Sequence, residues 1–225
     1  MRAPLSIVIP TLNSADDLPD TLVCLMEGLE TGLVRELIIS DGGSQDTTSV
    51  IAQNIGAVFL SGEAGRGGQL SRGAGAASGD WLLFLHSDTH LENGWARVVA
   101  DHIGTRQKAG YFRLRFRALG LAPVIVAGWA NIRSRFGLPY GDQGLLISRR
   151  LYDNVGGYKK YPLMEDVALA RSLRGRMIGL SCDAHTGAQK YEMHGWFRRG
   201  AGNLWTFLRY LFGVDPEILA RNYRR

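Results

Sequence analysis

The chain has 225 residues, of which 45% are hydrophobic and 21% charged, and its formal net charge is +5. This composition excludes a largely disordered protein, and the longest nearly apolar stretch, 118–132, is shorter than the ~20 residues of a membrane-spanning helix. Two cysteines, Cys24 and Cys182, are too few for a disulfide framework or a cysteine-rich zinc site. The length predicts one domain, and the basic balance indicates an anionic partner.

The first half of the chain alternates short apolar strands with helices. Strands are expected at residues 5–10, 36–40, 57–60 and 81–85, and helices at 15–28, from about 44 to 54, and from the Gly-rich segment 62–68 to about 78. In the first helix we expect Asn13 or Ser14 to be the cap. Repeated strand–helix units predict an α/β fold with a mostly parallel sheet and helices on both faces.

Polar side chains follow the predicted strands directly. In open α/β sheets ligands bind outside the carboxyl ends of the strands, so these residues should converge on one crevice. They are Thr11, Asn13, Asp41, Glu63, Arg66, His86, Ser87 and Asp88.

The second half is less regular. We expect strands at 111–117 and 145–148, a helix at 118–136 bent at Pro123, and helices at 164–173, 196–212 and 215–223. Arginines alternate with aromatic residues toward the C-terminus, which predicts either a docking helix with a solvated basic face or a helix that contacts an anionic membrane. These residues are Arg198, Arg199, Arg209, Arg221, Arg224 and Arg225, with Trp196, Phe197, Trp205, Phe207 and Tyr210.

Two common nucleotide-binding motifs are absent. The sequence contains no G-x-x-x-x-G-K-S/T phosphate loop, and residues 10–13 (PTLN) stand where a G-x-G-x-x-G fingerprint would follow the first strand. The α/β pattern therefore supports neither a P-loop NTPase nor a Rossmann dehydrogenase.

Four ordered segments carry a resemblance. They are 6–13 (SIVIPTLN), 41–48 (DGGSQDTT), 79–89 (GDWLLFLHSDT) and 164–166 (MED). This series resembles family 2 glycosyltransferases of the GT-A fold over nearly the whole chain. Segments 140–144 (YGDQG), 164–166 and 213–217 (GVDPE) are similar to a bacterial subfamily associated with arsenosugar biosynthesis.

The resemblance implies a reaction and a division of the chain. A nucleoside-diphosphate sugar, a UDP or GDP form, would give its sugar to the hydroxyl of a small-molecule or lipid-linked acceptor with inversion. Residues 1–110 would be the nucleotide-binding half, and residues 111–225 the acceptor-binding half with C-terminal helices. Asp166 would be the general base, with Glu165 beside it at the start of a helix; the other interpretation is two acids that complement the helix dipole.

The resemblance also implies donor contacts. Asp41 would bind the nucleobase, although its carboxylate also suits a capping role in the following Gly-rich turn. Thr11 and Asn13 would line the base and ribose pocket. Arg66 and Arg72 flank a helix-opening segment suited to phosphate oxygens, and either could be a plain surface arginine.

A divalent cation, Mg²⁺ or Mn²⁺, is expected at Asp88, because a carboxylate at the end of an apolar strand has no packing role and these ions bind oxygen. The common family motif has two acids, whereas this chain has His86, Ser87 and Asp88, so the metal could arrive mainly with the nucleotide. Further candidates are His194 as a metal ligand, Trp196 stacking on a sugar or packing in the core, and Asp142, Gln143 and Ser87 as substrate contacts.

Two other functions remain open. A sugar-phosphate nucleotidyltransferase would want a Gly-rich basic loop after the first strand, which residues 10–13 do not supply. A non-catalytic module that binds nucleotide or lipid is the other. No signal peptide is recognisable, so we expect a cytoplasmic protein, free or peripheral to the inner membrane face, and we expect no nucleic acid partner.

Overall fold

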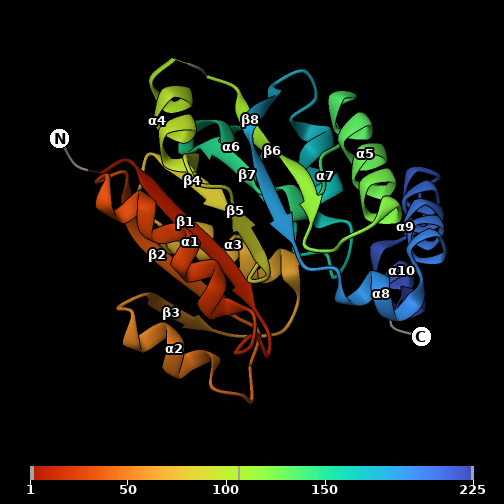
Figure 1. Ribbon diagram of the computed structural model, residues 1–225, viewed down its shortest axis with the longest axis horizontal. Coiled ribbons are helices and arrows are strands. Elements are labelled where there is room, and N and C mark those ends of the chain that lie inside the picture. Colours follow the sequence, from red (N-terminus) through yellow and green to blue (C-terminus); the bar gives the residue numbers. More distant parts are fainter. Residues whose placement is uncertain (1–2, 106, 224–225) are drawn as a thin grey trace.

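The computed structural model describes residues 3–105 and 107–223, with the side chain of Tyr223 excepted (Figure 1). Arg224 and Arg225, which the sequence placed in the basic tail, lie outside the described residues. One eight-stranded sheet runs through this part of the chain in the order β3-β2-β1-β4-β7-β6-β8-β5. The predicted α/β class with a mostly parallel sheet and helices on both faces is confirmed.

The first four strands in this order are parallel. They are β3 (Val58–Ser61), β2 (Val34–Asp41), β1 (Leu5–Thr11) and β4 (Trp81–Phe84). On β1, Ile7 and Ile9 pack into one core cluster, whereas Val8 packs into a second cluster with Leu70 of α3 (Arg66–Ala76). Because alternate side chains of a strand point to opposite faces, this sheet is covered on both sides, which explains its nearly continuous apolar strands.

The other four strands are mixed in direction. They are β7 (Leu145–Ser148), β6 (Ala109–Phe116), β8 (Met177–Thr186) and β5 (Thr89–Leu91). β7 is antiparallel to both β4 and β6, β8 is parallel to β6, and β5 is antiparallel to β8. The sheet therefore continues from the predicted nucleotide-binding half into the predicted acceptor-binding half.

The sequence prediction omitted β8, the longest strand. Burial alternates along residues 179–182 of this strand, where Gly179 and Ser181 are exposed and Leu180 and Cys182 are buried. This period of two is the pattern expected of a strand with one covered face, so the signal for β8 was present in the sequence.

Eleven helical segments surround the sheet in the described residues. They are α1 (Leu18–Glu30), α2 (Thr48–Asn54), α3 (Arg66–Ala76), α4 (Trp95–Thr105), α5 (Leu121–Arg135), η1 (Gly141–Gln143), α6 (Arg149–Asn154), α7 (Glu165–Ser172), α8 (Gln189–His194), α9 (Trp196–Leu211) and α10 (Pro216–Tyr223). No helix within 3–105 or 107–223 is long and apolar enough to cross a bilayer.

The starts of α1, α2 and α5 differ from the prediction, and α2 begins at Thr48 rather than near residue 44. α1 begins three residues later than expected, because the amides of Asn13, Ser14 and Ala15 donate instead to side chains of the loop 44–48. Pro123 lies in the first turn of α5, where its missing N–H removes no intrahelical hydrogen bond, rather than inside a bent helix.

The first turn of α3 packs so tightly against the segment 159–161 that only glycine fits at one position. A Cβ at Gly67 would overlap the Lys159 carbonyl oxygen and lie 2.8 Å from that of Tyr161. At neighbouring Gly68, a Cβ would meet nothing within 4 Å.

These two glycines therefore predict opposite effects on stability. We expect Gly67→Ala to lower the free energy of unfolding by ~1–3 kcal/mol through steric overlap. Gly68→Ala, the matched control, should raise it by roughly 0.5–1 kcal/mol because alanine favours the helix. Urea unfolding of both variants measures the difference, and equal effects would contradict the close packing of α3.

Candidate active site

A cleft of about 570 Å³ lies at the carboxyl ends of β1 and β4. Its walls come from five chain segments and several single residues. These are 10–14, 64–66, 86–88, 162–167 and 186–191 without Ala188, together with Asp17, Gln69, Phe116, Tyr140, Asp142, Arg199 and Asn203. Residues far apart in the sequence thus converge on one crevice, as the position of the strand ends predicts.

The cleft gathers most of the predicted site residues. Those that line it are Thr11, Asn13, Arg66, Ser87, Asp88, Asp142, Glu165 and Asp166. Those that do not line it are Asp41, Arg72, Gln143, His194 and Trp196.

Asp41 is buried and holds the turn that follows β2. Its carboxylate accepts hydrogen bonds from the Thr11 hydroxyl at 2.8 Å, from the amides of Gly43 and Ser44 at 2.7 Å each, and from the Ser44 hydroxyl at 2.5 Å. Burial alone would raise the pKa of Asp41, but these donors lower it below its usual value. The carboxylate takes the capping role that the sequence allowed, just behind the cleft wall at Thr11.

Arg72 also lies behind this wall. One guanidinium nitrogen donates to the Asp41 carbonyl oxygen at 2.5 Å, and the same group fills the space beside Gly62. Gln69, one turn earlier on α3 and not predicted, lines the cleft and donates to the Thr11 and Ser40 carbonyl oxygens. α3 therefore braces the ends of β1 and β2.

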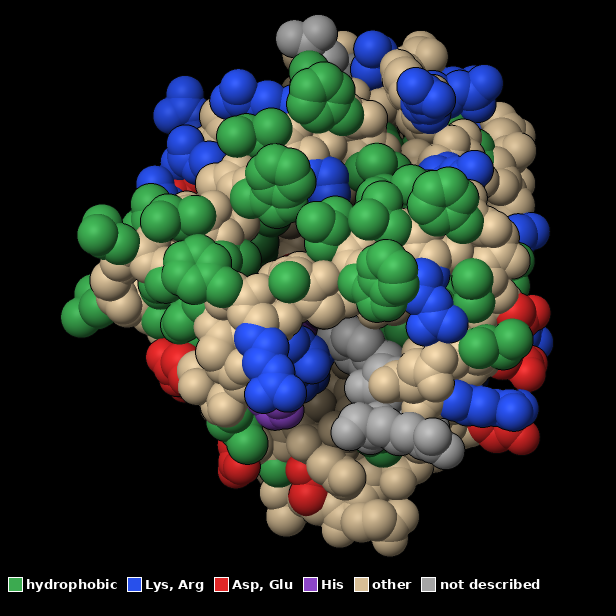
Figure 2. Space-filling view, turned by 90° about the vertical axis from the view of Figure 1, so that its right-hand side faces the viewer, with side chains coloured by type: hydrophobic (Ala, Val, Ile, Leu, Met, Phe, Trp, Pro, Cys, Tyr) green, Lys and Arg blue, Asp and Glu red, His purple; other side chains and the backbone are tan. Residues whose placement is uncertain are grey.

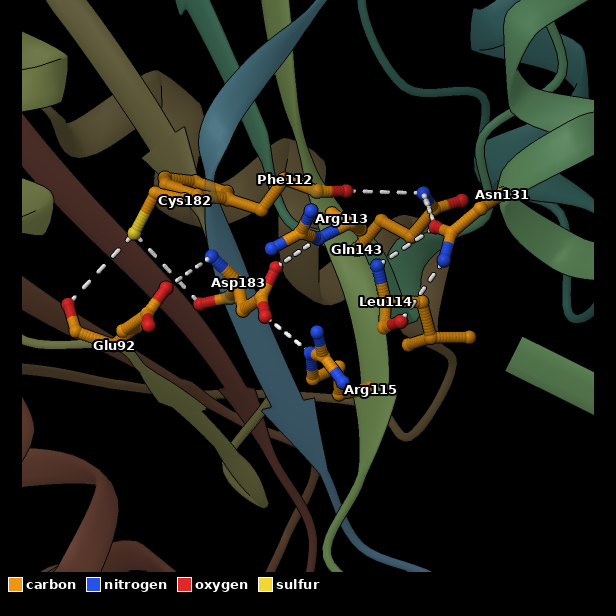
Figure 3. Close-up of polar contacts among 9 residues, drawn as sticks. All are labelled: Glu92, Phe112, Arg113, Leu114, Arg115, Asn131, Gln143, Cys182 and Asp183. Atoms are coloured by element: carbon orange, nitrogen blue, oxygen red, sulfur yellow. Dashed lines mark hydrogen bonds and ion pairs between the residues drawn. The ribbon is translucent and has the colours of Figure 1, made fainter. Parts of the chain in front are cut away.

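Gln143 does not reach the cleft, so its predicted substrate contact is corrected. The side chain is fully buried, accepts from the Ser134 hydroxyl at 2.5 Å and donates to the Phe112 carbonyl oxygen at 3.0 Å. Figure 3 shows it beside Asn131, which pairs with both backbone groups of Leu114 on β6. This network fixes η1, the short helix that carries Asp142 into the cleft.

Trp196 and His194 lie around the start of α9. The centroid of the Trp196 ring lies 5.0 Å from that of Phe116 and 5.1 Å from that of Tyr191, on which it stacks. This matches the core-packing alternative. His194 is exposed at the end of α8 and is not part of the cleft wall. Neither residue enters the cleft, whereas their neighbour Tyr191 does.

The acids at the start of α7 point into the cleft. Asp166 accepts hydrogen bonds from the Val167 amide at 2.7 Å and from the Gly141 amide at 2.9 Å, so its carboxylate is oriented by η1 and by its own helix. Met164, just before the helix, has a φ of 66°, and Asn13 has a φ of 50°. These are the two non-glycine residues with positive φ in the described chain, both line the cleft, and such strained backbone clusters at functional sites.

Glu165 is a buried acid whose Oε1 has no hydrogen-bond partner within the part of the chain that the structure describes. Its exposed fraction is 2%, and it forms an ion pair with the Arg66 guanidinium, whose Nε lies 3.6 Å from Oε1. Burial first, and the charge of Asp166 second, raise the pKa of Glu165 to about 7. A carboxyl group that changes charge near neutral pH therefore stands directly beside Asp166.

The raised pKa predicts how stability depends on pH. In the unfolded state Glu165 loses its proton near its ordinary pKa of 4.5, whereas in the folded state it keeps the proton up to about pH 7. The protonated carboxyl group therefore stabilises the folded state fully below pH 4.5. This contribution disappears as the pH rises to about 7. We expect Glu165→Gln to remove this decline, which is at most about 3 kcal/mol.

Thermal unfolding of the wild type and Glu165→Gln across this pH range measures the difference. Exposed Glu30→Gln is the matched control and should follow the wild-type profile. A profile of Glu165→Gln that parallels the wild type would contradict the raised pKa.

Asp88 lies in the cleft without a cationic partner in residues 3–105 and 107–223. Among the described residues, one hydrogen bond reaches its carboxylate, from the Thr89 hydroxyl at 3.4 Å. Arg117 donates to the Asp88 backbone carbonyl at 3.2 Å and lies 3.9 Å from the Asp17 carboxylate. Burial and the negative charge of Asp88 together raise the pKa of Asp17.

The oxygens at this position suit a hard divalent cation. Asp88 offers a carboxylate, Ser87 a hydroxyl, and Asp17 a second carboxylate on the same wall. No group of three or more His, Cys, Asp or Glu side chains in the described chain is arranged to hold a metal by itself. A bound cation would therefore need further oxygens, which the phosphates of a nucleotide can supply.

His86 replaces the first acid of the common motif and pairs with Asp142. Its Nδ1 lies 3.2 Å from the Asp142 carboxylate. Burial would raise the pKa of Asp142, but the hydrogen bond and charge of His86, followed by the charges of Arg66 and Arg133, lower it well below its usual value. Asp142 is therefore a fixed negative charge on the cleft wall.

Several cleft residues were not predicted. They are Asp17, Gln69, Phe116, Tyr140, Lys190, Tyr191, Arg199 and Asn203. Arg199 and Asn203 are four residues apart on α9, so the helical period brings both to one side of that helix. Tyr140 opens the 140–144 segment, and the Arg133 guanidinium lies 3.1 Å above its ring.

The chain is similar to a known protein family and to characterised members of it. The glycosyl transferase family 2 profile matches residues 6–120, just over half of the chain. A PGL/p-HBAD biosynthesis glycosyltransferase of Mycobacterium bovis is 38% identical over 110 residues, which cover 44% of this chain and 42% of that protein. A glucosyl-3-phosphoglycerate synthase of Mycolicibacterium smegmatis is 37% identical over 92 residues, 37% of this chain and 30% of that protein.

Solved structures share the fold. S. aureus TarS, residues 1–349, superposes with a TM-score of 0.61 at 16% identity, covering 82% of this chain and 60% of that one. Glucosyl-3-phosphoglycerate synthase from Mycobacterium tuberculosis, solved with Mn²⁺, UDP and phosphoglyceric acid, has a TM-score of 0.56 at 23% identity, covering 82% and 69%. The matched region spans less than half of the curated relatives named above.

Proposed function

Because the chain belongs to glycosyl transferase family 2, we propose that it moves a sugar from a nucleoside-diphosphate sugar to an acceptor hydroxyl. The observation that carries the proposal is the placement of Asp88, a carboxylate without a cationic partner in the described chain, in the same cleft as the oriented Asp166. One acid would anchor the donor's diphosphate through a cation, and the other would act on the acceptor.

Asp166 is the proposed general base. As the acceptor oxygen attacks the anomeric carbon, Asp166 takes the hydroxyl proton, and the electron pair of the breaking carbon–oxygen bond leaves with the nucleoside diphosphate. A single displacement of this kind inverts the anomeric centre. The two backbone amides that bind Asp166 hold its carboxylate in place before the acceptor arrives.

The leaving diphosphate gains negative charge in this step. Arg66 lies at the start of α3 on the cleft wall, where a guanidinium and helix amides favour phosphate oxygens. Asp88, with Ser87 and Asp17, would hold Mg²⁺ or Mn²⁺, and the ion when bound would neutralise the diphosphate. The related glucosyl-3-phosphoglycerate synthase structures contain these ions together with UDP, which supports this role.

The nucleoside would occupy the side of the cleft formed by residues 10–14. Thr11 and Asn13 line this side, and Asp41 fixes Thr11 from behind. We propose UDP or GDP as the nucleotide; the UDP complexes of TarS and of the synthase favour UDP. The walls from 162–167 and 186–191 would then receive the acceptor.

The acceptor class and the cellular site remain predictions. The 140–144 and 213–217 segments support an acceptor like that of the arsenosugar-associated subfamily, and a small molecule and a lipid-linked hydroxyl both stay open. The expected cytoplasmic location, and the absence of a nucleic acid partner, likewise remain part of this proposal.

Calorimetric titration with UDP and GDP, with and without Mn²⁺, followed by donor hydrolysis assays with UDP- and GDP-sugars, tests the proposed function. We expect Mn²⁺-dependent binding of one nucleotide and slow hydrolysis of a matching donor. Binding without turnover of any donor, in the presence of candidate acceptors, would favour the non-catalytic module. Release of pyrophosphate from a sugar phosphate and a nucleoside triphosphate would favour the nucleotidyltransferase.

A further inference from the structure

Helix α5 has its large apolar side chains on the outside. The residues it buries against the sheet are small ones, Pro123, Ala127, Ala130 and Ser134, spaced three or four apart. The side it exposes carries Leu121, Val124, Ile125, Trp129 and Ile132, whose exposed fractions run from 51% to 81%. An amphipathic surface helix normally buries its large apolar side chains and exposes polar ones. The exposed apolar side chains of α5 therefore indicate a surface that contacts another molecule or a membrane.

Helix α9 packs beside α5 and extends the same surface. Phe197 and Trp205 are 65% and 64% exposed. Figure 2 shows apolar side chains gathered across this end of the molecule, bordered by Lys and Arg. We call this surface the α5–α9 face and define it by Leu121, Val124, Ile125, Trp129, Phe197 and Trp205.

The charge of these two helices has one sign. Together they carry Arg133, Arg135, Arg198, Arg199 and Arg209 and no Asp or Glu. Of these, Arg135 and Arg198 are exposed, whereas Arg133 lies over the Tyr140 ring and Arg199 lines the cleft. Exposed aromatic residues with a basic border are the pattern of a surface that lies in the headgroup region of an anionic bilayer.

The α5–α9 face is close to the active-site cleft. Arg199 and Asn203 on one side of α9 line the cleft, whereas Phe197 and Trp205 are exposed. A helix with its side chains is about 10 Å across, so a surface in contact with the α5–α9 face would lie near the acceptor side of the cleft.

We infer that the α5–α9 face docks the protein on a lipid surface rich in anionic headgroups, with α5 and α9 lying in the plane of that surface. This contact goes beyond the proposed transfer reaction, which a small soluble acceptor would satisfy without it. If the transferase assignment also holds, the contact presents the cleft to acceptors embedded in the membrane.

Flotation of the protein with lipid vesicles tests the docking. We expect binding to vesicles of phosphatidylcholine mixed with phosphatidylglycerol, and weak binding to phosphatidylcholine alone, because each interfacial arginine strengthens anionic binding roughly fivefold. Tryptophan fluorescence should shift to shorter wavelength on binding, since Trp129 and Trp205 are exposed whereas Trp81 and Trp95 are buried.

Paired variants separate the contributions. Trp129→Ser with Trp205→Ser should lower vesicle binding about tenfold or more, and Arg135→Gln with Arg198→Gln should remove the preference for anionic vesicles. The matched control is Val23→Ser with Val50→Ser, which alters exposed apolar residues on α1 and α2 and should bind like the wild type. None of these residues lines the cleft, so donor hydrolysis should stay unchanged in all of them.

Three results would overturn the inference. The first is that the wild type does not bind anionic vesicles. The second is that the tryptophan variant binds them as tightly as the wild type. The third is a dimer whose formation depends on concentration in sedimentation velocity and is lost in the tryptophan variant, while neither the wild type nor this variant binds vesicles. The α5–α9 face would then join two copies of the chain. Each result can occur whether or not the protein transfers sugar.

Discussion

Asp166→Asn should abolish sugar transfer and leave nucleotide binding intact. The amide cannot accept the acceptor's proton, so we expect the transfer rate to fall by ~10²–10⁴-fold. The nucleotide is expected on the far wall, at Thr11 and Asn13, so the affinity for UDP with Mn²⁺ should change little. Single-turnover assays measure the first quantity and calorimetry the second.

Asp166 also has a structural role, so the Asp166→Asn variant needs controls for folding and for the loss of an acidic residue. Asp166 accepts from two backbone amides, and an asparagine side chain has one oxygen to serve them, so thermal unfolding should accompany the assay. The matched variant is Asp153→Asn, which removes an exposed acid from α6 and should keep full activity. A folded Asp166→Asn protein that still transfers sugar would assign the base to another group.

Asp88→Asn should uncouple nucleotide binding from the divalent ion. The wild type is expected to bind UDP more tightly when Mn²⁺ is present, because Asp88 holds the ion that contacts the diphosphate. Removing this carboxylate should lower the Mn²⁺-dependent affinity by roughly 10–100-fold, and binding without the ion should be unchanged or slightly stronger because one negative charge is lost.

Asp80 is the matched control for Asp88, because the two acids flank the same strand, β4, at opposite ends. Asp80 is exposed and lies away from the cleft wall. Asp80→Asn should therefore retain the full effect of Mn²⁺ on UDP affinity. If Asp88→Asn retains it as well, the ion is held elsewhere or is not used.

The parts predicted well from sequence were those with a local physical signature. β1, β2, β3 and β4 are short apolar runs followed by turn residues, and they form the parallel part of the sheet as expected. Because strand ends converge by topology alone, six of the polar residues that follow the predicted strands could be brought to the cleft without knowing any side-chain contact; they are Thr11, Asn13, Arg66, His86, Ser87 and Asp88. Asp41 and Glu63, predicted in the same way, do not line the cleft, and Asp142, Glu165 and Asp166 were expected from the family resemblance.

The errors came from contacts between distant segments. Gln143 stands in a Gly-flanked turn and was predicted to contact substrate, but its burial depends on Ser134 and Phe112, which no local pattern reveals. Trp196, for which core packing was the stated alternative, is half-buried against Phe116 and Tyr191, and this contact too depends on distant segments. Asp183 on β8 binds both Arg113 and Arg115 of β6, an arrangement that requires knowing that these strands are neighbours (Figure 3).

The pairing of β7 with β4 has a consequence for dividing the protein. The family match ends at residue 120, but the strand that covers the open edge of β4 is contributed by residues 145–148. A fragment trimmed to the matched region would leave the backbone of β4 without its partner and would tend to aggregate through that strand. Expression designs and chimeras should therefore keep the chain whole through β8.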